Sequence, residues 1–147
     1  MLGKHVIKTW SSTQTVVALS SGEAEYYGVT RGACEGIGIL GLIGDLSGHT
    51  MKINLSTDSS AAKGIATRRG VGKVKPLETR TLWVQDQVDR GRLQIRKIDG
   101  RINPADLLTK YLSGSRLSAL LNDLPLCFEG GRHRLAVKLQ GASSECV

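Results

Sequence analysis

Three acidic residues occupy positions that are typical of catalytic carboxylates. Glu25 lies one turn before Val29 in a helical pattern, on the face expected to look at a sheet. Asp58 stands at the carboxyl end of a predicted strand, and Asp106 is the third residue of a predicted helix. Taken singly, each acid has an ordinary explanation, because acidic side chains cap helices and stabilise their N-termini. Taken together, three acids around one sheet edge match a two-magnesium site, in which hard oxygen ligands hold the ions.

The positive charge of the chain is confined to one segment. The 147 residues carry a net charge of +7, and residues 63–101 contain eleven basic and four acidic residues, so the remainder is neutral. A concentrated basic region is the electrostatic footprint of a polyanion partner, and a solvated basic surface is the alternative. Gly70, Gly72 and Pro76 interrupt the segment, which disfavours an amphipathic membrane helix. The predicted nucleic-acid contacts are Lys63, Arg68, Arg69, Lys73, Lys75 and Arg101.

Composition and cysteine spacing limit the classes of protein to which this chain can belong. With 40% hydrophobic and 22% charged residues, the chain has the composition of one folded domain rather than of a disordered protein. The longest apolar stretch, residues 36–44, stops at Asp45 and is too short to cross a bilayer. Cys34, Cys127 and Cys146 form no CxxC pair, which predicts reduced thiols. We therefore expect an intracellular protein, without a choice between cytoplasm and nucleus.

Hydrophobic periodicity predicts an α/β domain with the order ββ-α-β-α-β-α. A β-hairpin comes first, then a helix of about six turns capped by Ser20, and short strands and helices alternate after it. Apolar and polar residues alternate over 51–56, which predicts a strand that ends near Asp58. The other expected elements are strands over 5–10 and 15–19, a helix after Ser20, a helix capped by Ser59–Ser60 that runs to Ala66, a helix from Pro76 to Gly91, a strand around Leu93 and Ile95, a helix over 105–112 capped by Asn103, and a short helix over 115–122.

Several sequence blocks resemble the ribonuclease H domain at the carboxyl end of copia-type retrotransposon polyproteins. The blocks are WSSTQ at 10–14, VALSSGEAEY at 17–26, Thr57–Asp58 and NPADLLTK at 103–110, and the match spans about Met1 to Leu112. The resemblance implies an RNase H-like mixed sheet flanked by helices, which cleaves the RNA strand of an RNA–DNA hybrid with Mg²⁺ or Mn²⁺. It also implies that Glu25, Asp58 and Asp106 are metal ligands.

The chain departs from that family at its start. The family's first strand, with its first catalytic Asp, lies upstream of the matched segment, and no Asp or Glu precedes Glu23 here. We therefore expect residues 1–112 to form a partial RNase H-like domain without its first strand, and residues 113–147 to form a short helix and an irregular basic tail.

The function expected from this arrangement is that of an RNase H fragment that is inactive as an isolated chain, because its two-metal site is incomplete. A non-catalytic nucleic-acid-binding remnant or interaction module is the alternative. Val6, Ile7 and Trp10 would then face an unpaired sheet edge, which predicts self-association.

Overall fold

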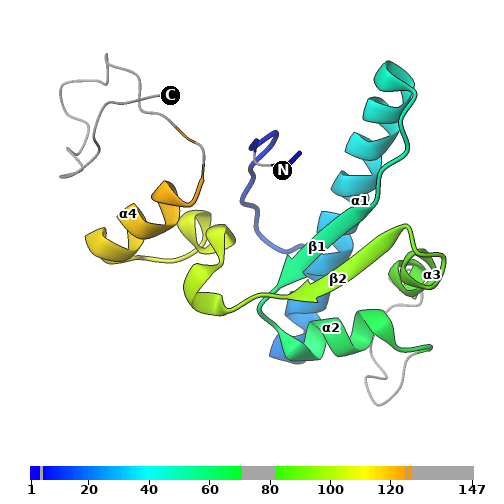
Figure 1. Cartoon of the computed structure of the whole chain (residues 1–147). Helices are drawn as coiled ribbons and strands as arrows, with labels where there is room; N and C mark the ends of the chain where they lie inside the picture. Colours follow the sequence, from blue (N-terminus) through cyan, green and yellow to red (C-terminus); the bar gives the residue numbers. More distant parts are fainter. Residues whose placement is uncertain (4, 71–81, 125, 127–147) are drawn as a thin grey trace. The chain divides into compact units, whose positions relative to one another are not determined.

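The computed structural model describes residues 1–3, 5–70, 82–124 and 126, which form two compact units (Figure 1). Residues 14–100 form the helix–sheet unit, and residues 1–13 with 101–147 form the Asp106 unit. The elements in chain order are α1 (Ser21–Ser47), β1 (Ile53–Thr57), α2 (Ser60–Thr67), α3 (Trp83–Asp89), β2 (Leu93–Lys97), the 3₁₀ helices η2 (Gly100–Ile102) and η3 (Pro104–Leu108), and α4 (Gly114–Asn122).

The long helix α1 has well-defined signals at both ends. The Ser20 side chain accepts a hydrogen bond of 3.2 Å from the backbone N–H of Glu23, which confirms the predicted N-cap. At the other end Gly48 adopts a φ of 68°, and its N–H donates to the Gly44 carbonyl over 2.8 Å. A left-handed residue of this kind favours glycine, because other side chains are strained there. The helix therefore runs for 27 residues, longer than the six turns predicted.

The sheet of the helix–sheet unit consists of two parallel strands. β1 and β2 pair in register from Ile53 with Leu93 to Thr57 with Lys97, and α2 and α3 form the crossover between them. One face of the sheet packs against the helices, where Leu93 and Ile95 are buried. The opposite face carries the exposed side chains of Asn54, Ser56, Gln94 and Arg96. The predicted alternation in β1 and the predicted strand around Leu93 and Ile95 are therefore confirmed.

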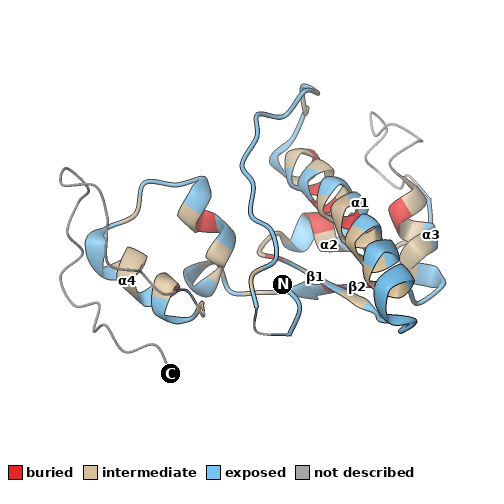
Figure 2. Cartoon of the chain, turned by 90° about the horizontal axis from the view of Figure 1, so that it is seen from above, coloured by how far each residue is buried: buried red, intermediate tan, exposed pale blue. Residues whose placement is uncertain are grey.

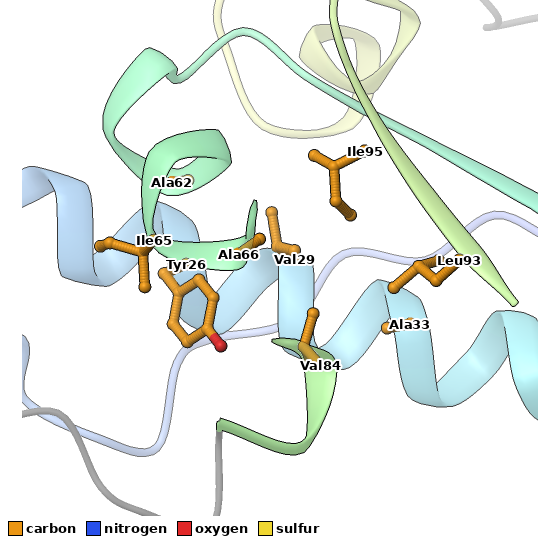
Figure 3. Packing of buried hydrophobic residues seen from close by; sticks show 9 residues of the cluster. All are labelled: Tyr26, Val29, Ala33, Ala62, Ile65, Ala66, Val84, Leu93 and Ile95. Atoms are coloured by element: carbon orange, nitrogen blue, oxygen red, sulfur yellow. The ribbon is translucent and has the colours of Figure 1, made fainter. Parts of the chain in front are cut away.

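Nine buried side chains from α1, α2, α3 and β2 form the core of this unit (Figure 3): Tyr26, Val29, Ala33, Ala62, Ile65, Ala66, Val84, Leu93 and Ile95. Gly32 and Gly36 bring α1 close to β1. A Cβ at Gly32 would lie 3.1 Å from Leu55 Cδ1, and one at Gly36 would lie 3.3 Å from Ile53 Cγ2. The two glycines therefore allow α1 to pack closely on the sheet, and the small alanines allow similarly close packing within the core.

The buried residues of α1 all lie in its first half (Figure 2), between Glu23 and Ala33. Beyond Ala33 the helix is still apolar, but Leu42 is 59% and Leu46 79% exposed, whereas Ile37, Leu40 and Ile43 are half-buried. Full burial is therefore confined to the first half, and the exposed end of the helix depends more on its own hydrogen bonds.

The predicted hairpin is wrong. Residues 5–19 contain no strand, and the start of the chain has only a single bridge between Leu2 and His5. Ile7 and Trp10 are 52% and 40% exposed, so this segment has no apolar face buried against a core. A two-stranded hairpin is marginal in water without such packing, and β-branched composition alone does not form one. The sheet edge expected at Val6, Ile7 and Trp10 is therefore not formed by these residues.

The elements around Asn103 are a further correction. Asn103 caps a helix as predicted, with its side chain accepting from the Ala105 N–H over 3.2 Å, but that helix is a five-residue 3₁₀ helix rather than an α-helix to Leu112. Leu108 and Tyr111 are exposed, so no apolar face holds a longer helix. The short helix predicted near 115–122 is confirmed as α4.

The remaining fold predictions have mixed outcomes. The mixed α/β class is confirmed, but an RNase H-like sheet is not, since the described residues contain two strands only. The first turn predicted from Pro76 lies outside the described residues, whereas the rest of that helix is present as α3 and is followed by Gly91 with a φ of 68°. No helix within the described ranges is long and apolar enough to span a membrane.

Candidate nucleic-acid and metal site

Asp58 lies where the sequence predicts it, directly after β1. Ile98 N–H donates to the Thr57 carbonyl over 3.0 Å, which continues the strand pairing up to the residue before Asp58. The carboxylate is half-buried beside Gly100, and a Cβ at Gly100 would lie 3.3 Å from Asp58 Oδ2. The absence of a side chain at Gly100 therefore leaves room for the Asp58 carboxylate at the carboxyl end of the sheet.

Glu25 does not lie on the buried face of α1, contrary to the sequence-based expectation. Glu25 is exposed, whereas Glu23 is buried with 2% exposure. Glu23 is fully engaged in the local structure, because its carboxylate accepts from Leu19 N–H over 2.9 Å and from the Tyr27 hydroxyl over 3.2 Å. The buried face therefore runs through Glu23, Tyr26, Val29 and Ala33.

Tyr26 directly follows Glu25 in sequence and belongs to the core. Its side chain is fully buried, and this burial raises its pKa from 10.0 to about 12, against the opposing effects of the Thr30 side chain and the Arg68 charge. The aromatic ring at the third position after Glu23 is the sequence signal that identifies the buried face.

Asp106 is buried in the Asp106 unit and already has two cationic partners. Lys110 Nζ lies 2.8 Å from Oδ1, Arg116 Nη2 lies 3.0 Å from Oδ2, and the aspartate side chain is only 4% exposed. The Lys110 pair is an i,i+4 contact that can be read from the sequence. The Arg116 pair joins η3 to α4, and no spacing rule could have predicted it.

These three carboxylates differ in their fit to the magnesium ions that the family resemblance implies. Glu25 is exposed and Asp58 is half-buried, whereas each oxygen of Asp106 is ion-paired. Asp106 therefore does not fit the role of an open metal ligand. Within the described residues no group of three or more His, Cys, Asp or Glu side chains is placed to hold a metal ion.

The predicted basic contacts have different environments. Lys63 and Arg68 are half-buried on α2 and at its C-cap, and Arg101 is exposed in the Asp106 unit. Arg69 is exposed and donates to both carboxylate oxygens of Asp89, over 3.1 and 3.2 Å. Lys73 and Lys75 lie outside the described residues.

Gln85 on α3 connects the two ends of the segment that contains Lys73 and Lys75. Its Oε1 accepts from Gly70 N–H over 2.9 Å, and its Nε2 donates to the carbonyls of Ile65 and Gly70 over 2.8 and 3.1 Å. The sequence does not single out this residue. A glutamine that hydrogen-bonds through both its amide oxygen and its amide nitrogen belongs to no recognisable sequence motif. Gln85 fixes the position where the chain leaves α2.

Fold and site together define a mixed α/β protein with a short parallel sheet, an aspartate at the carboxyl end of that sheet, and a basic central segment. The chain is similar to the retrovirus-related Pol polyprotein from transposon TNT 1-94 of Nicotiana tabacum, with 33% identity over 106 residues. The match covers 71% of this chain and 8% of that polyprotein, so the chain spans a small part of the curated relative. No family model matches the chain, and no solved structure does.

Proposed function

We propose that this chain is a ribonuclease H-like segment of a retrotransposon Pol polyprotein that binds nucleic-acid duplexes, including RNA–DNA hybrids, and does not cleave RNA by itself. The similarity to a Pol polyprotein supports the origin. The SSGEAEY and NPADLLTK blocks support the assignment to the ribonuclease H region.

The charge distribution is the observation that carries the binding function. Residues 63–101 hold the entire net charge of +7, and Arg69 and Arg92 within this segment are exposed. The pair between Arg69 and Asp89 is also exposed, with side-chain exposures of 88% and 62%. Exposed pairs of this kind contribute roughly 0–1 kcal/mol, so Arg69 can exchange Asp89 for a phosphate at little cost. Contacts to phosphates give affinity without sequence preference.

The lack of cleavage by the isolated chain follows from the state of the carboxylates. Glu25 and Asp58 remain the proposed ligands for Mg²⁺ or Mn²⁺, but Asp106 is held by two cations. Residues 1–22 contain no acid that could take its place. A metal-dependent phosphodiester cleavage site needs several oxygen ligands around two ions, and two open carboxylates do not provide them.

The second candidate is a nucleic-acid-binding remnant whose cleavage activity is not restored by an upstream segment. The ion pairs of Asp106 favour this candidate. The two candidates differ when an upstream segment with an Asp-bearing strand is fused to the chain. A fragment of an enzyme gains magnesium-dependent cleavage of hybrid RNA, which Asp58→Asn then abolishes. A binding remnant gains none.

The binding function is tested by the salt dependence of affinity for an RNA–DNA hybrid. Arg69→Gln with Arg92→Gln should lower the slope of log K against log salt by about 2. The matched control is Arg31→Gln with Lys52→Gln, which removes the same charge from exposed positions of the same unit outside residues 63–101. Equal slopes for the two double variants would show that the segment is an ordinary solvated surface.

A further inference from the structure

Both oxygens of the buried Asp106 carboxylate are held by cationic side chains. Lys110 Nζ lies 2.8 Å from Oδ1, and Arg116 Nη2 lies 3.0 Å from Oδ2. A buried carboxylate needs such partners, because burial of an isolated charge is very unfavourable. A divalent cation that binds this carboxylate is repelled by the two cationic partners and must displace one of them.

Arg116 holds an unusual place in its own helix. The Ser113 side chain caps α4 by accepting from the Arg116 N–H over 3.4 Å, which puts Arg116 in the first turn. The helix dipole disfavours a positive charge at that end. The ion pair with Asp106 offsets this unfavourable interaction of Arg116 with the helix dipole. Arg116 therefore links α4 to η3 through Asp106.

We infer that Asp106 is the structural anion that joins η3 to α4, and that α4, while docked, withholds this carboxylate from divalent cations. The inference concerns the Asp106 unit alone and does not depend on whether the chain binds nucleic acid. The two cationic partners of Asp106, Lys110 and Arg116, have different roles. Lys110 belongs to the same turn as Asp106, so it remains nearby if α4 leaves, whereas Arg116 leaves with α4.

The structural part is tested by amide hydrogen exchange in the full 147-residue chain. Arg116→Met and Asp106→Asn should each lower the protection of residues 114–122 at least tenfold. The double variant should lose no more than either single variant, since both remove the same pair. Arg116→Lys should restore part of the protection, and Arg92→Met, which removes an exposed cation from the other unit, should leave it unchanged. Unchanged protection in Arg116→Met would overturn the role of the pair.

The withholding part is tested with Mn²⁺ as the probe, by water-proton relaxation and without nucleic acid. Arg116→Met should bind Mn²⁺ at least tenfold more tightly than the unaltered chain, and adding Asp106→Asn should remove that gain. Equal affinity in Arg116→Met and the unaltered chain would contradict the withholding role. Mn²⁺ binding by the unaltered chain that is lost on Asp106→Asn would show that Asp106 is a ligand with α4 in place. Neither result bears on hybrid binding, which is measured separately.

Discussion

Replacing Gly22 with alanine tests the packing between α1 and α2. A Cβ at Gly22 would lie 2.9 Å from the Cβ of Ala61. Two carbon atoms in contact prefer about 3.5–4.0 Å, so the two helices must separate by roughly half an ångström or more. The atom in the way is a Cβ, which cannot rotate aside as the end of a flexible side chain can. Overpacking of this kind costs about 1–3 kcal/mol.

Alanine also raises helix propensity relative to glycine, which acts in the opposite direction. The gain is about 0.5–1 kcal/mol in a helix interior and smaller at the second residue of a helix, where Gly22 lies. Gly22→Ala should therefore lower the free energy of unfolding by about 1–2 kcal/mol. Gly28→Ala is the matched control on the same helix, because nothing lies within 4 Å of its added Cβ. That variant should be more stable by about 0.5–1 kcal/mol.

Urea unfolding of the two variants and the unaltered chain measures both effects. The difference between the variants should be about 2 kcal/mol, well above the uncertainty of a midpoint comparison at constant slope. If Gly22→Ala were as stable as Gly28→Ala, α1 and α2 would not approach each other as closely as described, and the argument from the glycine positions would be refuted.

Three further substitutions, with Gln94→Ala as a control, test the core of the helix–sheet unit and the cap of α2. Because the pKa of Tyr26 is raised from 10.0 to about 12, its neutral form stabilises the fold fully below pH 10, and about 3 kcal/mol is lost as pH rises from 10 to 12. Tyr26→Phe should lose less stability over this range in pH-dependent unfolding. Leu93→Ala should cost about 2–5 kcal/mol in urea unfolding, and Gln94→Ala on the exposed face far less. Ser59→Ala removes the cap hydrogen bond to Ala62 N–H and should cost about 1 kcal/mol by the same measurement.

Local signals in the sequence predicted most of the helix–sheet unit. Ser20 and Ser59 were expected as caps, and both accept the backbone hydrogen bonds that define the start of α1 and α2. The alternation in β1, and Leu93 and Ile95 in β2, predicted the two strands and the side chains that face the helices. These features depend on residues within one turn or one strand, and for that reason the sequence alone is sufficient to predict them.

Features that depend on distant partners were not predictable in the same way. The β-branched run before Ser20 has the composition of strands, yet it forms no strand and most of its side chains are exposed. Glu25 was placed on the inner face by a strict spacing of four, whereas the true helical period puts Glu23 there. The environment of Asp106 depends on Arg116, ten residues away on another helix, which no periodicity could reveal.

The most direct test of the account is a gel-retardation assay of the full chain with an RNA–DNA hybrid whose RNA strand is labelled, in the presence of Mg²⁺. We predict a retarded complex at about 50 mM salt that dissociates by about 200 mM, because phosphate contacts dominate. We also predict that the RNA recovered from the complex is intact. Failure to form any complex at low salt would contradict the binding function. Cleaved RNA that becomes intact on Asp58→Asn would contradict the claim that the isolated chain does not cleave.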